Sequence, residues 1–219
     1  MIREVFYLDY FNGLLEGDKE KCRKIIDNLL NAKTSILEIY TDIFQKSLYQ
    51  IGKMWDQNKL SIGDEHLGTE ITEDLLYYCS SKITPRKKLN TKALVACINK
   101  EYHKLGARMA ADIFVLNGWE TYFLGASTPT KEIVKYIELK KPEIVGLSFS
   151  FYINIMKLID VLKVIKSRFP AQKIIVGGRI DMNGNADILT KFENVHYFST
   201  ILSLDEYLKK ESDRSSDFY

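Results

Sequence analysis

Apolar positions in the first part of the chain recur with the spacing of amphipathic helices. Between residues 1 and 83 the large apolar side chains return every three or four positions, and proline is absent. A glycine followed by an acid, and then two short polar stretches, divide this part into segments. The pattern predicts helices over residues 3–15, 18–31, 34–56 and 61–81. Because the turns between them are short, we expect an antiparallel four-helix bundle.

The second part of the chain alternates short apolar runs with longer amphipathic stretches. The runs predict β-strands over residues 92–98, 120–124, 144–149, 173–176 and 195–198. The stretches between and after them predict helices over residues 104–117, 130–140, 153–168, 186–191 and 203–210. Strands and helices that alternate in this way form a doubly wound parallel sheet with right-handed crossovers. We therefore expect an α/β fold with a helical bundle over residues 1–83, a solvated linker over 84–90, a five-stranded parallel sheet domain over 91–210 and a flexible tail over 211–219.

Composition narrows the class of protein. The 219 residues are 46% hydrophobic and 27% charged, which is ordinary for a globular chain. A net charge of +2 gives no basic surplus for nucleic acid, and no apolar run is long enough to cross a membrane. The N-terminus lacks the apolar core of an export signal, and Cys22, Cys79 and Cys97 form no Cys-x-x-Cys pair. We expect a cytoplasmic protein with neither a disulfide framework nor a zinc site.

The most informative stretch lies where the first predicted strand passes into a helix. Glu101 and His103 follow the strand, and Gly106 opens the helical pattern. Ligands of open α/β folds bind at this carboxyl edge of the sheet. An imidazole there can direct one ring nitrogen toward a flat ligand, while Glu101 accepts the other ring N–H and fixes the tautomer. Taken alone, Glu-x-His-x-x-Gly is a weak pattern, and a solvent-exposed histidine is the simpler interpretation.

Small residues end the third and fourth predicted strands. Ser148 and Ser150 close the third strand, and Gly177 and Gly178 follow the fourth. Adjacent glycines let a ligand lie against the backbone, and a serine hydroxyl can bond to it at the bottom of a groove. A tight turn and an incidental small side chain are the alternatives. Together with His103, these residues predict a narrow slot, which a valine at position 178 is expected to fill while leaving the fold intact.

A second cluster is expected at one end of the helical bundle. Trp55 ends the third predicted helix, and Glu65 and His66 lie in the first turn of the fourth. The short turn between these helices brings the three side chains to the same end. An indole, a carboxylate and an imidazole can together cover a flat, partly polar ligand. The alternative is that Trp55 belongs to the core and that Glu65 offsets the helix dipole.

These stretches together resemble the cobalamin-binding modules, in which a four-helix cap precedes a Rossmann-like, flavodoxin-like domain. The resemblance spans residues 3–210. In that family an Asp/Glu-x-His-x-x-Gly motif supplies the lower axial histidine to cobalt, and here residues 101–106 read Glu-Tyr-His-Lys-Leu-Gly. The family's serine after the third strand matches Ser148, and its glycine pair matches Gly177 and Gly178. The resemblance implies that these positions line the slot for the detached dimethylbenzimidazole tail of the cofactor.

Within that family, the chain is similar to the light-sensing, adenosylcobalamin-dependent regulators. Methyl-carrying members usually have Asp at the position of Glu101, and the cap of the regulators carries a Trp and a later Glu-His that contact the adenosyl group. Trp55, Glu65 and His66 match that arrangement. Two features depart from it. The sequence has no counterpart of the regulators' helix-turn-helix domain, so we expect no direct DNA binding. Asp56 stands where some regulators have a second histidine that binds cobalt after photolysis.

Two functions follow from this resemblance. The first is an adenosylcobalamin-dependent sensor or regulatory module that prefers adenosylcobalamin to methylcobalamin. The second is a corrinoid protein that carries a methyl group between partner methyltransferases. Glu101 and the cap residues favour the first, whereas the absence of an output domain favours the second. A receiver-like or flavodoxin-like module is a third interpretation, although a receiver needs clustered acids.

We expect no catalytic residues, because the chemistry belongs to the cofactor. We also expect a partner protein or a homo-oligomer, and no membrane association.

Overall fold

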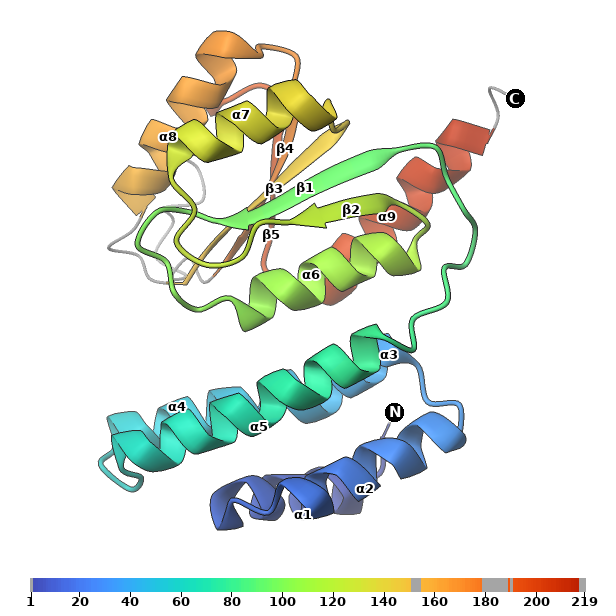
Figure 1. The fold of residues 1–219 in the computed structure, drawn as a ribbon, viewed down its shortest axis with the longest axis vertical. Helices are drawn as coiled ribbons and strands as arrows, with labels where there is room; N and C mark the ends of the chain where they lie inside the picture. The colour runs from blue at the N-terminus through green and yellow to red at the C-terminus, as the bar shows by residue number, and fades with distance from the viewer. Residues whose placement is uncertain (1, 151–154, 179–188, 190, 217–219) are drawn as a thin grey trace. The chain divides into compact units, whose positions relative to one another are not determined.

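The computed structural model describes residues 2–150, 155–178, 189 and 191–216. The chain divides into two compact units, Met1–Ile83 and Thr84–Tyr219 (Figure 1). Within the described ranges the first unit contains only helices, and the second contains a sheet with helices. None of the helices in these ranges combines the length and the apolar character that a membrane crossing needs.

The first two helices are α1 (Glu4–Glu16) and α2 (Lys19–Asn31). α1 ends at Gly17, whose φ of 68° lies in the left-handed region that glycine adopts without strain. The side chain of Asp18 then accepts a hydrogen bond from the N–H of Lys21 at 2.8 Å and caps α2. The helix break that the glycine and the acid predicted is therefore present.

One continuous helical rod follows, and its middle part is wound as a π-helix. The rod consists of α3 (Ile36–Glu38), the π-helical segment η1 (Ile39–Gln45) and α4 (Lys46–Asp56). Ser35 and Glu38 begin it with reciprocal hydrogen bonds, the arrangement known as a capping box. Within η1, the hydroxyl of Thr41 donates to the carbonyl oxygen of Leu37 at 3.1 Å, and such bonds compete with the regular helical pattern. The sequence predicted a single α-helix here, because apolar spacing does not distinguish the two windings.

The fourth member of the bundle is α5 (Ile62–Ser80). It also begins with a capping box, formed by Ser61 and Asp64. The core of this unit is almost wholly apolar, and its fully buried side chains include Tyr10, Ile26, Ile39, Phe44, Ile51 and Leu76. Polar contacts also cross it, such as the one between the hydroxyl groups of Tyr10 and Thr72, which lie 3.2 Å apart. The unit is thus held together mainly by apolar burial.

The second unit is built on a parallel sheet whose described strands number five, in the order β2-β1-β3-β4-β5 (Figure 1). The strands are β1 (Lys92–Cys97), β2 (Glu120–Phe123), β3 (Ile144–Phe149), β4 (Lys173–Gly178) and β5 (Val195–Phe198). The helices are α6 (Leu105–Leu116), α7 (Thr130–Lys140), α8 (Ile155–Arg168) and α9 (Ile201–Ser216). α7 and α8 cover one face of the sheet, and α6 and α9 cover the other. The doubly wound α/β fold predicted from the sequence is confirmed.

Several boundaries differ from the prediction. β4 continues through Gly177 and Gly178, which pair with Ser148 and Phe149 of β3, so the glycine pair does not form a tight turn. α9 runs to Ser216, beyond the predicted end at residue 210 and into the stretch expected to be a tail. The predicted helix over 186–191, apart from residues 189 and 191, lies outside the described residues, as does the predicted start at residue 153.

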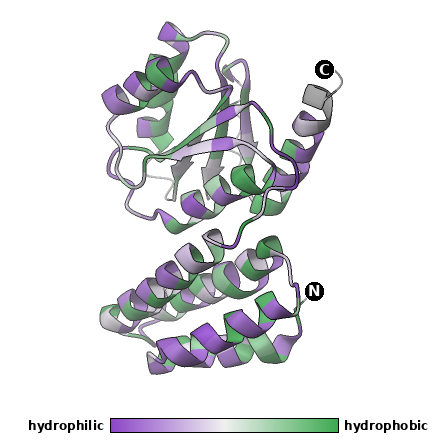
Figure 2. Cartoon of the chain, turned by 45° about the vertical axis from the view of Figure 1, so that its right-hand side comes forward, coloured by the Kyte–Doolittle hydropathy of each residue, from purple (hydrophilic) through white to green (hydrophobic). Residues whose placement is uncertain are grey.

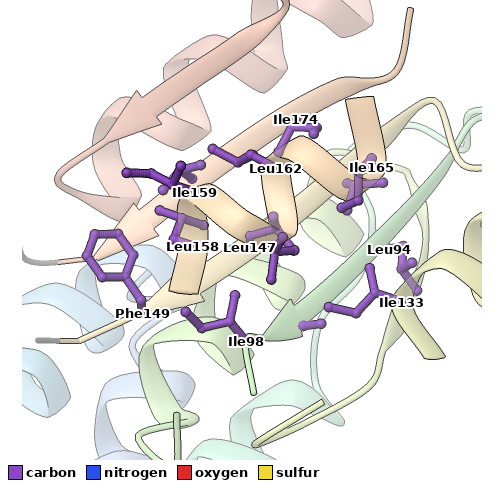
Figure 3. Close-up of a cluster of buried hydrophobic side chains, with 14 of the residues drawn as sticks. Leu94, Ile98, Ile133, Leu147, Phe149, Leu158, Ile159, Leu162, Ile165 and Ile174 are labelled. Atoms are coloured by element: carbon purple, nitrogen blue, oxygen red, sulfur yellow. The ribbon is translucent and has the colours of Figure 1, made fainter. Parts of the chain in front are cut away.

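The main core of the second unit lies between the sheet and α7 and α8 (Figure 3). It includes Leu94, Ile98, Ile133, Leu147, Phe149, Leu158, Leu162 and Ile174. Figure 2 colours the same elements by hydropathy, and the helices of this unit carry both hydrophilic and hydrophobic residues. Because side chains alternate along a strand, Cys97, Ser148 and Gly177 belong to the opposite face, which α6 and α9 cover.

The segment expected to be a solvated linker is docked on the sheet unit. The N–H of Arg86 donates to the carbonyl oxygen of Leu116 at 2.9 Å. Its guanidinium bonds to Asp205 at 2.7 Å, and this carboxylate is only 1% exposed. Asn117 and Lys209 also contact Asp205, at 2.8 and 2.7 Å. Burial would raise the pKa of Asp205, but these bonds outweigh it and lower the pKa. Most residues of the segment are exposed, as expected of a solvated connector, and Arg86 in addition anchors the segment to a buried carboxylate.

Candidate functional site

The carboxyl end of β1 runs into a tight turn that carries the candidate ligand residues. The N–H of Glu101 donates to the carbonyl oxygen of Ile98 at 2.9 Å and closes the turn. Lys100 holds the third position of the turn with a φ of 64°, in the left-handed region. His103 follows, and α6 begins at Leu105. Glu101 and His103 therefore lie between a strand and a helix, at the carboxyl edge of the sheet.

Glu101 and His103 form the most tightly bonded pair at this edge. One carboxylate oxygen, Oε1, accepts from the backbone N–H of His103 at 2.9 Å and lies 2.8 Å from ring atom Nδ1. The other oxygen, Oε2, accepts from the N–H of Ser150 at 2.7 Å. Glu101 is 1% exposed, whereas the His103 side chain is 63% exposed. A buried carboxylate thus orients an imidazole that stands out from the surface.

The charge of Glu101 follows from these hydrogen bonds. Burial alone would raise the pKa of its carboxyl group. The bonds from the His103 ring, the His103 N–H and the Ser150 N–H outweigh burial and lower the pKa from 4.5 to about 2. Glu101 is therefore ionised at neutral pH. Because an ionised carboxylate can only accept, the proton of a neutral His103 ring lies on Nδ1, and the lone pair lies on Nε2.

A row of small residues crosses the sheet beside this pair. Cys97 of β1 lies opposite Ser148 of β3, and Ser148 lies opposite Gly177 of β4. A Cβ atom added to Gly177 would meet no atom of the described residues within 4 Å, and the same holds for Gly106 in the first turn of α6. Burial raises the pKa of Cys97 to about 12, so its thiol stays neutral. Small, uncharged side chains thus occupy the positions at which the slot was predicted, and the slot itself stays a prediction.

Gly178 differs from its neighbour. Its φ is 154°, and a Cβ atom added there would lie 2.0 Å from the carbonyl oxygen of Phe149. The side chain of Tyr197 donates to the carbonyl oxygen of Gly178 at 2.7 Å. The expectation that a valine at this position leaves the fold intact is therefore wrong, because the backbone itself requires glycine. Gly177 is the position at which a side chain would enter open space.

The second predicted cluster lies at one end of the helical bundle. Trp55 in the last turn of α4 is 44% exposed, so it is not a core residue. The turn that follows is closed by a bond from the N–H of Lys59 to the carbonyl oxygen of Met54 at 2.9 Å. Glu65 and His66 lie in the first turn of α5, with Oε2 and Nε2 3.7 Å apart. The structure thus brings all three residues to the end at which α4 meets α5.

One further residue at this end was not predicted from the sequence. Ile62 begins α5 and is 60% exposed, which is high for a large aliphatic side chain. It lies between Trp55 and Glu65 along the chain. Its signal was present in the sequence as an apolar residue directly after the cap Ser61, but a single apolar residue at a helix start has many explanations.

Comparison with known proteins identifies the family. Residues 91–193 match the family described as B12 binding domain, and residues 9–80 match a second family with the same description. Together the two matches cover most of the chain, and one lies within the sheet unit and the other within the helical unit. The chain belongs to the B12-binding proteins, and it is a cobalamin-binding module with a helical cap and a Rossmann-like domain.

Two relatives are transcriptional repressors of Myxococcus xanthus. The chain is 27% identical to the HTH-type transcriptional repressor CarA over 149 residues, which are 68% of this chain and 48% of CarA. It is 22% identical to the HTH-type transcriptional repressor CarH over 131 residues, which are 60% of this chain and 43% of CarH. The chain therefore spans about half the length of these relatives.

Solved corrinoid proteins share the fold. The monomethylamine corrinoid protein of Methanosarcina barkeri matches with a TM-score of 0.81 and 12% identity, over 95% of this chain and 99% of that one. A cobalamin-binding protein from Desulfitobacterium hafniense matches with a TM-score of 0.50 and 19% identity, over 96% of this chain and 98% of that one. The methanol:cobalamin methyltransferase complex MtaBC of Methanosarcina barkeri matches with a TM-score of 0.51 and 11% identity. That match covers 97% of this chain and 81% of the other. At these identities the likeness shows the fold alone.

Proposed function

We propose that the chain holds cobalamin with His103 as the lower axial ligand of cobalt and with the cofactor's own base detached. The observation that carries this proposal is the contact of 2.8 Å between Nδ1 of His103 and the buried, ionised carboxylate of Glu101. This contact fixes the tautomer with its lone pair on Nε2, and neutral imidazole is a suitable ligand for transition metals. The ring is exposed enough to meet a flat cofactor outside the sheet edge.

The small residues beside His103 fit the second part of the proposal. A detached base needs a channel without large side chains, and Gly177 offers open space where a Cβ would stand. Ser148 lies next to it in register and can offer its hydroxyl. Gly106 leaves open space at the start of α6. We therefore propose that Ser148, Gly177 and Gly106 line the path of the nucleotide tail. Gly178 acts through the backbone, because it allows β4 to pass Phe149.

The protein contributes binding and electronic tuning, and we propose no catalytic residue. When bound, cobalamin supplies the reactive cobalt–carbon bond. Glu101 keeps its negative charge against the His103 ring, which raises the donor strength of Nε2. Ser150 contributes its backbone N–H, which holds the far oxygen of Glu101, in addition to any role of its hydroxyl. The loops that hold Glu101 would therefore tune how strongly His103 donates to the cobalt.

We further propose that the native form is adenosylcobalamin and that the chain serves as a sensor or regulatory module. Trp55, Glu65 and His66 are exposed or half-buried and lie at one end of the bundle. An indole can stack on adenine, and a carboxylate can accept from ribose hydroxyls. The similarity to the repressors CarA and CarH supports a regulatory role. Ile62, at the same end, adds an apolar contact.

The alternative is a corrinoid methyl carrier that works with a methyltransferase partner. One observation favours it. The monomethylamine corrinoid protein matches almost end to end, with 95% of this chain and 99% of that chain covered. A methyl carrier would need the upper face of the cofactor open to its partner, whereas an adenosyl sensor would cover it. The two functions therefore differ in how much Trp55 contributes to the binding of each cobalamin form.

The axial assignment is tested with His103→Ala and reduced, Co(II) cobalamin. We expect the variant to lose the nitrogen splitting of the axial imidazole in the electron paramagnetic resonance spectrum. We also expect its affinity to fall at least about tenfold, which corresponds to about 1.4 kcal/mol. His196→Ala is the matched control, because His196 is an exposed histidine on β5, outside the proposed site. An unchanged axial signal in His103→Ala would show that another group, or the cofactor's own base, binds the cobalt.

A further inference from the structure

The loop between β2 and α7 is bonded to the turn that precedes His103. The Oγ atom of Ser127 accepts from the N–H of Lys100 at 3.0 Å. The N–H of Ser127 donates to the carbonyl oxygen of Glu101 at 2.8 Å. Ser127 therefore bonds to the backbone on both sides of the Lys100–Glu101 peptide. The backbone of the turn therefore depends on a residue that is distant in sequence and lies on another loop.

Both partners in this contact have an unfavourable backbone conformation. Lys100 has a φ of 64° and Ser127 a φ of 47°, and neither is a glycine. Side chains with a Cβ disfavour the left-handed region, and such residues persist when their surroundings hold them there. The hydroxyl of Ser127 is one of the groups that hold Lys100. The strained backbone torsion and the bond that restrains it thus belong to the same residue, Lys100.

The loop that carries Ser127 is itself anchored to the end of β1. The N–H of Thr128 donates to the carbonyl oxygen of Cys97 at 3.0 Å, and the N–H of Cys97 donates to that of Gly125 at 3.0 Å. Thr128 also forms a parallel bridge with Ile98. These bonds lie on both sides of Ser127 in the sequence. The backbone on both sides of Ser127 is therefore held in place by β1, and this fixes the position of Ser127 next to Lys100.

We propose that Ser127 is a positioning residue for His103. Its hydroxyl and its N–H hold the turn so that the carboxylate of Glu101 and the ring of His103 keep the orientation needed for axial ligation. The inference rests on the proposed function, since the axial role of His103 defines what is positioned. It predicts that the occupancy of the axial position depends on a loop that does not itself supply the ligand.

The first test uses the protein without cofactor. Ser127→Ala removes the acceptor for the N–H of Lys100, and we expect hydrogen exchange of that amide to become about five-fold faster, the size of one lost hydrogen bond. Ser127→Asn keeps an oxygen acceptor and tolerates the left-handed region, so it should stay near the wild-type rate. Ser81→Ala, which deletes an exposed hydroxyl in the helical unit, is the control. Unchanged exchange in Ser127→Ala would overturn the proposal.

The second test uses Co(II) cobalamin and a rescue variant. Ser127→Ala should lower the fraction of protein whose spectrum shows an axial imidazole nitrogen. Lys100→Gly relieves the left-handed strain without removing the backbone N–H, so the double variant should recover that fraction. If Ser127 acted only on overall stability, Ser127→Ala and the double variant would both show a lower fraction with an axial nitrogen. If Ser127→Ala keeps the full axial signal while His103→Ala loses it, the positioning role is wrong and the axial assignment stands. If His103→Ala keeps the signal, the proposed function itself is wrong.

Discussion

The sheet edge and the bundle end present their candidate ligand residues in different ways. At the sheet edge, Glu101 is 1% exposed and its carboxylate accepts from two N–H groups and from the His103 ring. At the bundle end, Trp55 is 44% exposed and the His66 side chain is 69% exposed. The first group is fixed by the protein's own hydrogen bonds. The second is held only in part, because Trp55 and His66 are exposed whereas Glu65 accepts from the hydroxyl of Thr69 at 3.0 Å.

This difference predicts how the two regions respond to substitution. A site held by internal bonds and by backbone shape should lose stability, or lose binding of every cobalamin form, when it is altered. A site made of more exposed side chains should affect the stability of the apo protein less and should discriminate between upper ligands. Preorganised groups bind with a smaller entropic cost than groups that must be ordered on binding. The sheet edge should therefore supply most of the affinity, and the bundle end most of the selectivity.

The largest effect is expected from Gly178→Val, and it concerns stability. The new Cβ would meet the carbonyl oxygen of Phe149 at 2.0 Å in a backbone that already has a φ of 154°. We expect the free energy of unfolding of the apo protein to fall by about 3 kcal/mol or more, measured by denaturant titration. Gly177→Ala is the control and should lose less than about 1 kcal/mol. Similar losses at the two positions would contradict the distinction between them.

Gly177→Leu should have the next largest effect, on cobalamin binding. The side chain would occupy open space beside Ser148, where we propose that the nucleotide tail lies. We expect the affinity for both adenosyl- and methylcobalamin to fall about 100-fold, or about 2.7 kcal/mol, with stability close to that of Gly177→Ala. Calorimetric titration of the size series Gly, Ala and Leu measures this. Wild-type affinity in the leucine variant would mean that the tail lies elsewhere.

The smallest effect, and the most selective, is expected from Trp55→Ala. Because the indole is 44% exposed, its removal should lower the free energy of unfolding less than Gly178→Val does. Adenosylcobalamin should bind about tenfold more weakly, since it loses a stacking surface, while methylcobalamin should change by less than about twofold. Tyr49→Ala, another exposed aromatic residue on the same helix, is the matched control. Equal losses for the two forms would favour the methyl carrier over the sensor.

The features that the sequence predicted are those with a local signal. Apolar runs located the strands, and the run that ends before Glu101 and His103 placed both residues at the sheet edge. The features that it missed depend on the three-dimensional environment. The φ of Gly178 and its approach to Phe149 follow from the pairing of β3 with β4. The contact between Ser127 and Lys100 joins two loops 27 residues apart. The π-helical winding of η1 leaves the buried face of the rod unchanged, so the hydrophobic pattern does not reveal it.

The bond between Arg86 and Asp205 determines where the chain can be cut to obtain a stable sheet unit. A fragment cut at residue 91, where the first strand was predicted to begin, would lack the guanidinium that neutralises Asp205. That carboxylate would remain buried with Asn117 and Lys209, and its partial loss of pairing should make the fragment less stable. A fragment that begins at residue 84 keeps the pair. The shortest independently folding cobalamin-binding piece of this chain should therefore include a segment that contributes neither a strand nor a ligand.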